Sequence, residues 1–290
     1  MCLETFIIEG GKESIPGRRE ILKGYEDLLE VPQMTKSALI TGTTSGIGKA
    51  LAEKFAREKT NLILVSRDIR KLSQQADLLS GQYGVKVNFI AANLEKEDAA
   101  LMVYEKVKQM GIEIQYLVNN AGFNECGLFL ETDVLKEIDM IKVHAVCTTE
   151  MMKLFIPDMV KNGYGRVLNL GSTASYMPCP NSSVYGATKA YVLSVSKGLG
   201  AELKGTGVTI TTLCPGATNT EFARKAEMEN TLLFRIFVME PEDVANAGYR
   251  ALMRGKTYVV PGIYNKLLVI SSKLVPLFIL SSVTKMMLKR

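Results

Sequence analysis

A tyrosine, a lysine and a serine stand where they could move a proton to or from a substrate. Tyr185 and Lys189 lie four residues apart in a segment with a helical pattern, so their side chains share one face of the predicted helix. An ammonium group beside a phenol favours the phenolate, which would lower the tyrosine pKa from about 10 towards neutrality. Ser172 precedes the tyrosine and could hold a carbonyl oxygen by a hydrogen bond. The three residues predict general acid–base chemistry.

A glycine-rich segment upstream, GTTSGIG at 42–48, joins a predicted strand to a predicted helix. Glycines let the backbone turn sharply and approach a pyrophosphate, and the N-terminus of the following helix supplies N–H donors. A glycine-rich turn without a ligand is the alternative, but the position between strand and helix favours a nucleotide site. The candidate contact residues are Gly42, Thr44, Ser45, Gly46, Ile47 and Gly48.

The end of the second predicted strand carries a cation where a dinucleotide fold places the adenosine ribose. An acid at that point bonds a 2′-hydroxyl group, whereas an arginine accommodates a 2′-phosphate. Ser66 and Arg67 therefore predict NADP(H) rather than NAD(H), and Asp68 is the competing observation.

Two amides and two small residues, NNAG at 119–122, close the fourth predicted strand. Small residues at the carboxyl end of a strand suit a backbone that lines a ligand crevice. Asn120, Ala121 and Gly122 are therefore candidate cofactor contacts, with an ordinary turn as the alternative.

Short apolar runs that alternate with helical patterns must position these groups. The predicted strands are 37–41, 61–66, 86–92, 115–120, 166–171, 208–214 and 257–260. The predicted helices are 46–58, 70–79, 97–110, 132–161, 183–204 and 241–255. Strands rich in Val, Ile and Leu that alternate with amphipathic helices indicate an α/β fold with a parallel sheet covered on both faces.

The pattern predicts one doubly wound domain over residues 36–262, with no repeat and no linker. Residues 1–35 read as a loosely packed N-terminal extension, and Met34 is an alternative start. Residues 263–290 form an apolar, basic C-terminal tail.

The charge is unevenly distributed along the 290 residues. The net charge is +5, and five cations but no acid follow Gly262, so the remainder is balanced. A balanced body argues against a nucleic-acid partner. Five scattered cysteines without a CxxC pair predict reduced thiols and a cytoplasmic location, and one histidine predicts no metal site.

These motifs together resemble the short-chain dehydrogenase/reductase family over about residues 36–260, most closely its hydroxysteroid dehydrogenase and 3-oxoacyl reductase branch. The resemblance rests on TGTTSGIG, NNAG, GS at 171–172, YGATK at 185–189 and LCPGATNTEF at 213–222. It implies a Rossmann-type three-layer sandwich with a seven-stranded parallel sheet. It also implies an enzyme that interconverts a carbonyl and an alcohol with a nicotinamide cofactor.

The resemblance also implies residue roles. Tyr185 would transfer the substrate proton, Lys189 would lower the pKa of that tyrosine and bind the nicotinamide ribose, and Ser172 would orient the carbonyl. Asn93 and Leu94 match the adenine-contacting position, where many members have Asp. In the family, one segment lies beside the nicotinamide carboxamide, and its counterparts here are Pro215, Gly216, Thr218 and Thr220. Members are often dimers or tetramers, so a homo-oligomer is expected.

One position departs from the family pattern. Members usually have an Asn in the long helix after the fourth strand, and this position falls on His144. The family's Asn mainly uses its backbone carbonyl, which a histidine retains. A proton relay through His144 is one interpretation, and a packed imidazole is the favoured alternative.

Two apolar segments bear on the substrate. Residues 221–240 should flank the pocket, together with the loop 176–180, as a mobile lid or as a core-facing helix. Residues 267–290 are too short and too interrupted to span a bilayer. That tail could lie on a membrane surface, or pack on a partner subunit or over its own pocket, and packing is slightly favoured.

Three functions are compatible with these patterns. The favoured one is an NADP(H)-dependent oxidoreductase that acts on a lipophilic carbonyl or secondary alcohol, of the steroid or long-chain 3-oxoacyl type. The alternatives are a non-catalytic dinucleotide sensor, which would be expected to lose Tyr185 or Lys189, and a membrane-surface adaptor that uses the tail alone.

Overall fold

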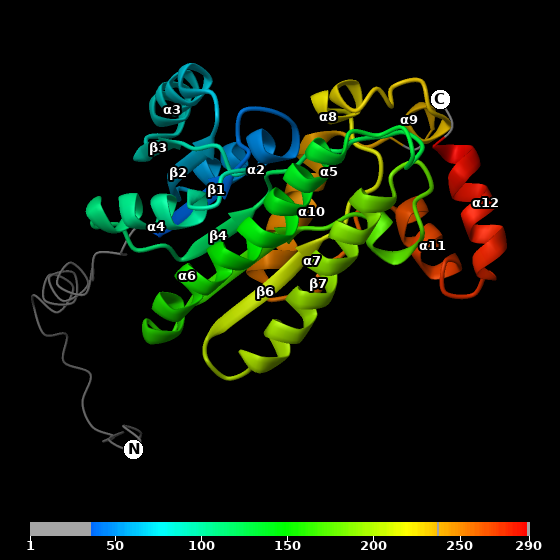
Figure 1. Ribbon diagram of the computed structural model, residues 1–290. Helices are drawn as coiled ribbons and strands as arrows, with labels where there is room; N and C mark the ends of the chain where they lie inside the picture. Colours follow the sequence, from blue (N-terminus) through cyan, green and yellow to red (C-terminus); the bar gives the residue numbers. More distant parts are fainter. Residues whose placement is uncertain (1–35, 237, 289–290) are drawn as a thin grey trace, which may run out of the picture. The chain divides into compact units, whose positions relative to one another are not determined.

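A parallel sheet forms the centre of the molecule. The computed structural model describes residues 36–236 and 238–288, so the predicted extension 1–35 lies outside the described residues. Seven strands are hydrogen-bonded in the order β3-β2-β1-β4-β5-β6-β7, and every pair is parallel. The order reverses between β1 and β4 (Figure 1), and in open parallel sheets ligands bind beyond the carboxyl ends of the strands at such a reversal. The predicted doubly wound fold is confirmed.

The strands are short, apolar and mostly buried, as strands covered on both faces must be. Each predicted strand is present, with its ends within one residue of the predicted bounds. The bounds are β1 Ser37–Thr41, β2 Asn61–Ser66, β3 Val87–Ala91, β4 Tyr116–Asn119, β5 Gly165–Leu170, β6 Val208–Leu213 and β7 Tyr258–Val259.

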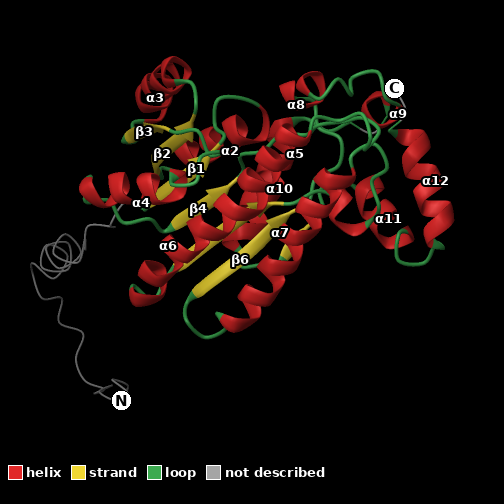
Figure 2. Ribbon diagram, in the orientation of Figure 1, coloured by secondary structure: helices red, strands yellow, loops and turns green. Residues whose placement is uncertain are grey.

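Helices cover both faces of the sheet (Figure 2). The described helices are α2 Gly46–Arg57, α3 Ile69–Tyr83, α4 Ala99–Gln109, α5 Val134–Ile141, α6 Thr148–Lys161, α7 Ser183–Glu202, α8 Glu221–Lys225, α9 Leu232–Arg235, α10 Pro241–Met253, α11 Ile263–Ser271 and α12 Leu277–Met287. Alternate strand residues point to opposite faces: Leu39 packs with the core under α4, α6 and α7, whereas Ile40 packs with the core under α2, α3 and α10.

The predicted helix 132–161 is not continuous. It consists of α5, a π-helical turn over Lys142–Cys147, and α6. A π-helical turn widens the helix locally, and such turns are frequent at functional sites. His144 lies in this turn.

The C-terminal tail folds into two helices, α11 and α12, and belongs to the same compact unit as the sheet, Lys36–Arg290. Over the residues that the structure describes, no helix is long and apolar enough to cross a membrane. Within that part of the chain there is also no group of three or more His, Cys, Asp or Glu side chains that could hold a metal ion.

Candidate active site

The glycine-rich turn between β1 and α2 is closely packed against the end of β4. A Cβ atom on Gly48 would lie 2.1 Å from the carbonyl oxygen of Gly42 and 2.3 Å from Nδ2 of Asn120. Gly42 itself has a φ of +71°, which favours glycine. The sequence therefore needs glycine here to bring the backbone to the crevice. Among the described residues, Ser45 at the start of α2 makes no side-chain capping bond, so the first N–H groups of α2 stay available for an anion.

Asn120 fixes this turn to the neighbouring strand. Its amide nitrogen donates to the carbonyl oxygens of Thr41 at 2.9 Å and Gly42 at 3.1 Å. The hydroxyl of Thr41 in turn accepts from the backbone N–H groups of Asn120 and Ala121, each at 3.0 Å. The NNAG segment thus holds the glycine-rich turn in place, which is a more specific role than lining a crevice.

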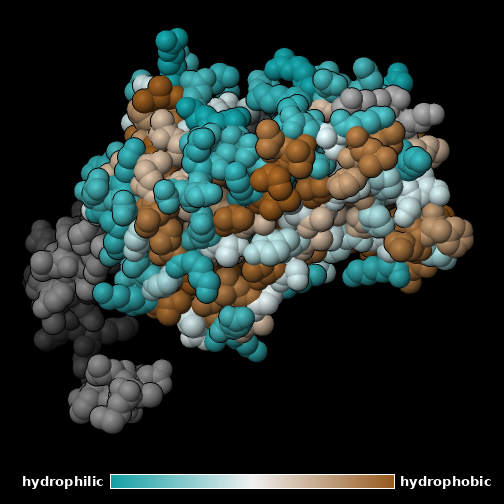
Figure 3. Space-filling model, in the orientation of Figure 1, coloured by the Kyte–Doolittle hydropathy of each residue, from teal (hydrophilic) through white to brown (hydrophobic). Residues whose placement is uncertain are grey.

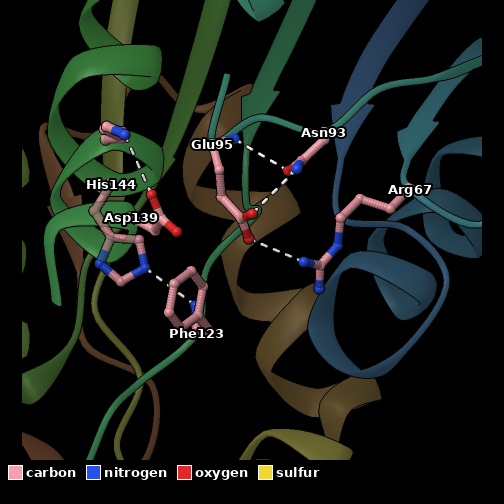
Figure 4. Close-up of polar contacts among 7 residues, drawn as sticks. Arg67, Asn93, Glu95, Phe123, Asp139 and His144 are labelled. Atoms are coloured by element: carbon pink, nitrogen blue, oxygen red, sulfur yellow. Dashed lines mark hydrogen bonds and ion pairs between the residues drawn. The ribbon is translucent and has the colours of Figure 1, made fainter. Parts of the chain in front are cut away.

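Arg67 extends from the end of β2 towards the loop that follows β3 (Figure 4). Its Nη1 lies 2.9 Å from Oε1 of Glu95, and the arginine side chain is 68% exposed. Asn93 donates from Nδ2 to Oε2 of Glu95 at 3.1 Å, and the Glu95 N–H donates to Oδ1 of Asn93 at 3.2 Å. These contacts join Arg67 to the predicted adenine-contacting position through a carboxylate that sequence reasoning missed.

Asp68, the acid whose position argued against NADP(H) in the sequence, has a structural role. Its Oδ1 accepts from the backbone N–H groups of Arg70 at 3.0 Å and Lys71 at 3.1 Å, so it caps the N-terminus of α3. Because Oδ1 of Asp68 bonds to two backbone N–H groups of α3, this carboxylate faces the helix and not a ribose. Arg67, in contrast, lines the crevice.

Ser172, Tyr185 and Lys189 converge at the carboxyl end of β5. Ser172 follows β5, and its Oγ accepts from the Ala174 N–H at 3.1 Å. Tyr185 and Lys189 lie one turn apart on α7, and the Lys189 Nζ is 5.6 Å from the centre of the Tyr185 ring. That ammonium group donates to the Leu170 carbonyl oxygen at 2.9 Å.

The electrostatics of this group differ from the expectation. Burial raises the pKa of Tyr185 above its ordinary value, and this effect outweighs the hydrogen bond from Ser172, which lowers it. Burial also lowers the pKa of Lys189 to about 7. Desolvation therefore dominates the pKa of both groups and opposes both charged forms, and the lowering of the tyrosine pKa by Lys189 stays a prediction.

His144 is buried, with 1% of its surface exposed, and both ring nitrogens are bonded within the protein. The Phe123 N–H donates to Nε2 at 3.2 Å, so the proton of the neutral ring is on Nδ1 and points to the Thr188 hydroxyl at 2.8 Å. The Thr188 hydroxyl in turn donates a hydrogen bond to the Tyr185 carbonyl oxygen at 2.8 Å. Burial, followed by the positive charge of Lys189, holds the pKa of His144 well below its ordinary value. This geometry favours a neutral, packed imidazole over a proton relay.

The predicted residues surround one cavity of about 350 Å³, within the usual range of small-molecule sites. All of the candidate site residues line it except His144, which lies behind its wall. The lining candidates are Gly42, Thr44, Ser45, Gly46, Ile47, Gly48, Ser66, Arg67, Asn93, Leu94, Asn120, Ala121, Gly122, Ser172, Tyr185, Lys189, Pro215, Gly216, Thr218 and Thr220.

A protein-family model matches most of the chain. The family model described as short chain dehydrogenase matches residues 36–231. The chain belongs to the short-chain dehydrogenase family. This short-chain dehydrogenase is accordingly an oxidoreductase that acts on alcohol or carbonyl groups.

Individual relatives are similar over most of the catalytic domain. An uncharacterized oxidoreductase of Bacillus subtilis is 38% identical over 186 residues, which are 64% of this chain and 70% of the relative. A very-long-chain 3-oxoacyl-CoA reductase of Anas platyrhynchos is 34% identical over 200 residues, which are 67% of this chain but only 63% of the relative. A solved short-chain dehydrogenase from Sphingobium yanoikuyae, in complex with NADPH, is 30% identical with a TM-score of 0.74, and the match covers 82% of this chain and 94% of that one.

The outer part of the cavity in this short-chain dehydrogenase is apolar and comes from the C-terminal segments. Segment 221–240 contains the short helices α8 and α9 instead of one core-facing helix. The tail also lines the cavity, so the structure agrees with one of the predicted alternatives, in which the tail packs over its own pocket. The apolar residues contributed by these segments are Phe222, Met228, Leu233, Phe234, Leu268, Leu280, Val283, Met287 and Leu288.

The tail of the short-chain dehydrogenase is also joined to the nicotinamide side of the crevice. Asn265 of α11 lies so close to Gly216 that a Cβ atom on this glycine would be 2.1 Å from Oδ1 of Asn265. The Asn265 amide is held by the Pro261 carbonyl oxygen at 2.9 Å. The first tail helix and the PG segment therefore pack as one unit.

Proposed function

We propose that the protein is an NADP(H)-dependent oxidoreductase that interconverts a carbonyl and a secondary alcohol on a lipophilic substrate, of the steroid or long-chain 3-oxoacyl type. The observation that carries the proposal is the convergence of Ser172, Tyr185 and Lys189 on a cavity that the glycine-rich turn also lines. The apolar outer wall supports a lipophilic substrate, and the match to a 3-oxoacyl-CoA reductase supports the long-chain type.

The residues at the adenosine end fit a 2′-phosphate. Arg67 is exposed at the mouth of the crevice, whereas Asp68 is occupied as a helix cap. The similarity to an NADPH-bound short-chain dehydrogenase supports the same preference. We infer NADP(H) over NAD(H) on these grounds.

The mechanism follows from the side chains at the nicotinamide end. A bound nicotinamide cofactor supplies or accepts the hydride. Ser172 donates its hydroxyl proton in a hydrogen bond to the carbonyl oxygen, and Tyr185 transfers a proton to that oxygen during reduction. A raised pKa keeps Tyr185 protonated at neutral pH, which suits proton donation. His144 positions Thr188, whose hydroxyl bonds to the Tyr185 carbonyl oxygen, and its Nδ1 proton is directed to Thr188 and not to the substrate.

The test is NADPH oxidation over a panel of steroid ketones, 3-oxoacyl thioesters and small aldehydes, with a Tyr185→Phe variant. We expect the variant to lose about 10²–10⁴-fold in kcat/KM, because the proton donor is gone, while the Kd for NADPH is unchanged. Tyr191→Phe is the matched control, because Tyr191 lies on the same helix but is exposed and bonded to Thr149.

Two outcomes would contradict the proposal. Full activity of Tyr185→Phe would remove the mechanism. NADPH binding without turnover of any carbonyl would favour a non-catalytic dinucleotide sensor, although both Tyr185 and Lys189 are present.

The proposal extends to the setting in which the enzyme works. We propose that the enzyme is a cytoplasmic homo-oligomer. Light scattering checks the oligomeric state, and a monomeric mass would contradict it.

A further inference from the structure

The two tail helices present a second apolar face, directed away from the cavity. We define this outer face by Ile263, Leu267, Ile270, Leu274, Leu277 and Phe278, of which Leu274 is 80% and Phe278 73% exposed. Figure 3 shows apolar side chains gathered where α11 and α12 meet, with polar side chains beside them. Exposed contiguous apolar surface of this kind marks an interaction site.

The outer face is distinct from the face of α12 that covers the cavity. Leu280, Thr284 and Leu288 recur every four residues, are buried and line the cavity. Leu277 and Phe278 lie on the same helix but do not line it. Helix α12 therefore forms a wall of the cavity with one side and carries part of the outer face on the opposite side.

The charged side chains on the tail itself have a single sign. Lys266, Lys273 and Lys285 are exposed on the tail helices or in the turn that joins them. No Asp or Glu follows Asp243 in the sequence. An apolar face rimmed by cations matches an interface of acyl chains and anionic headgroups.

A second copy of the chain is a poorer occupant. In a two-fold symmetric contact the same patch meets itself, so these lysines would face the partner's like charges in an apolar setting. An anionic bilayer surface instead offers apolar contact and opposite charge together.

We propose that α11 and α12 dock the enzyme on an anionic phospholipid surface, and that a lipophilic substrate reaches the cavity from the bilayer past α12. The route into the cavity rests on the proposed function. With 11 residues, α12 is about 16 Å long, which suits a helix lying in the interface.

The test is flotation of the full chain with phosphatidylcholine vesicles and with vesicles containing about one third phosphatidylglycerol. The wild type should bind the anionic vesicles, and added salt should weaken binding. Phe278→Glu should lower binding about tenfold or more, because a buried phenyl ring is replaced by an anion. Combined Lys273→Gln and Lys285→Gln should lower binding to anionic vesicles about 25-fold, at about fivefold per lysine.

Matched controls lie on α4, outside the tail. Leu101→Glu and Lys106→Gln change an exposed leucine and an exposed lysine and should leave vesicle binding within about twofold. Binding of Phe278→Glu at the wild-type level, or no binding of the wild type, would overturn the docking surface. Loss of an oligomer on Phe278→Glu without vesicle binding by the wild type would assign the face to a second copy instead.

The docking surface and the proposed function fail separately. Reduction of a water-soluble carbonyl without vesicles should be unchanged in Phe278→Glu, because this side chain does not line the cavity. Vesicle binding without turnover of any carbonyl would count against the function alone.

An independent observation at the other end of the crevice carries a second inference, which rests on the proposed NADP(H) preference. Both carboxylate oxygens of Glu95 are engaged, one by Arg67 at 2.9 Å and one by Asn93 at 3.1 Å, and all three residues line the cavity (Figure 4). A 2′-phosphate on Arg67 would compete with this carboxylate and meet its negative charge. We infer that Glu95 limits the preference for NADPH over NADH.

Fluorescence titration with NADPH and NADH tests this inference without a carbonyl substrate. Glu95→Gln should lower the Kd for NADPH about three- to tenfold and leave that for NADH within about twofold. Glu97→Gln is the control, because it removes an exposed carboxylate two residues away that does not line the cavity. An unchanged or raised Kd for NADPH in Glu95→Gln would overturn the role of Glu95.

Arg67→Ala separates this inference from the cofactor preference itself. We expect its Kd for NADPH to rise about 10- to 100-fold, since a charged hydrogen-bond donor is lost, with the Kd for NADH little changed. An unchanged Kd for NADPH in Arg67→Ala would count against the NADP(H) preference. If Arg67→Ala changes the Kd but Glu95→Gln does not, only the proposed role of Glu95 is contradicted.

Discussion

The cofactor side and the substrate side of the cavity are built in different ways. On the cofactor side, backbone groups of adjoining strands approach so closely that Gly48 has no room for a Cβ atom, and side-chain amides bond directly to the turn. On the substrate side, short helices and the tail supply apolar side chains, and one tail helix has apolar residues on both faces. The comparison indicates that the cofactor side is rigidly packed. The apolar helices over the substrate side can differ in sequence without disturbing it.

The largest expected effect comes from breaking the rigidly packed side. Gly48→Ala places a Cβ atom against Gly42 and Asn120, so we expect a loss of at least about 1–3 kcal/mol in the free energy of unfolding and about a hundredfold rise in the Kd for NADPH. Gly81→Ala in α3 is the control, because nothing lies within 4 Å of its added Cβ. Urea unfolding and NADPH titration measure both, and wild-type values for Gly48→Ala would contradict the close packing.

The pH dependence of stability tests whether the buried imidazole of His144 stays neutral in the folded protein. The folded-state pKa of His144 lies below its unfolded value of about 6.5, so the unfolded chain binds the proton first and stability is lost as the pH falls. From about pH 7.5 to about pH 5.5, the wild type should lose about 1.4 kcal/mol more than His144→Asn. Urea unfolding at both pH values measures this, and equal losses would show that His144 becomes protonated in the fold.

The same His144→Asn variant separates packing from a relay. If the imidazole is only packed, the pH dependence of kcat/KM should keep its shape in the variant. If one limb of the pH profile is lost or shifted in the variant, the result supports a proton relay through His144.

The smallest expected effect belongs to the apolar helices over the substrate side. Leu280→Ala shortens a buried side chain at the cavity, so KM for a long-chain substrate should rise about five- to tenfold, while the Kd for NADPH stays unchanged. Leu277→Ala, on the exposed face of the same helix, is the control, with both variants assayed without vesicles so that membrane docking does not contribute. A change in NADPH affinity for Leu280→Ala would show that the two sides are not independent.

The fold could be predicted closely because its signals are local. Apolar runs of strand length and the glycines at their ends fixed each strand to within one residue. The parallel order then brings the carboxyl ends of β1, β4 and β5 together, which places the glycine-rich turn, Asn120 and Ser172 around one cavity. The roles of these residues remain predictions.

Other features could not be predicted, because they depend on contacts distant in sequence or on burial. No side-chain pattern announces the π-helical turn that carries His144. Arg67 and Glu95 meet across 28 positions, and only the fold joins them. The pKa of Tyr185 depends on desolvation, which is a property of the packed site and not of the four-residue spacing to Lys189.

The contact between Gly216 and Asn265 has a consequence for protein engineering. Because the amide of α11 occupies the space that a side chain at position 216 would need, the tail cannot be exchanged between relatives as a free-standing module. A chimera that imports a new tail must import a residue at position 265 that fits against the PG segment. Libraries that vary the tail to change substrate choice should therefore hold this pair constant.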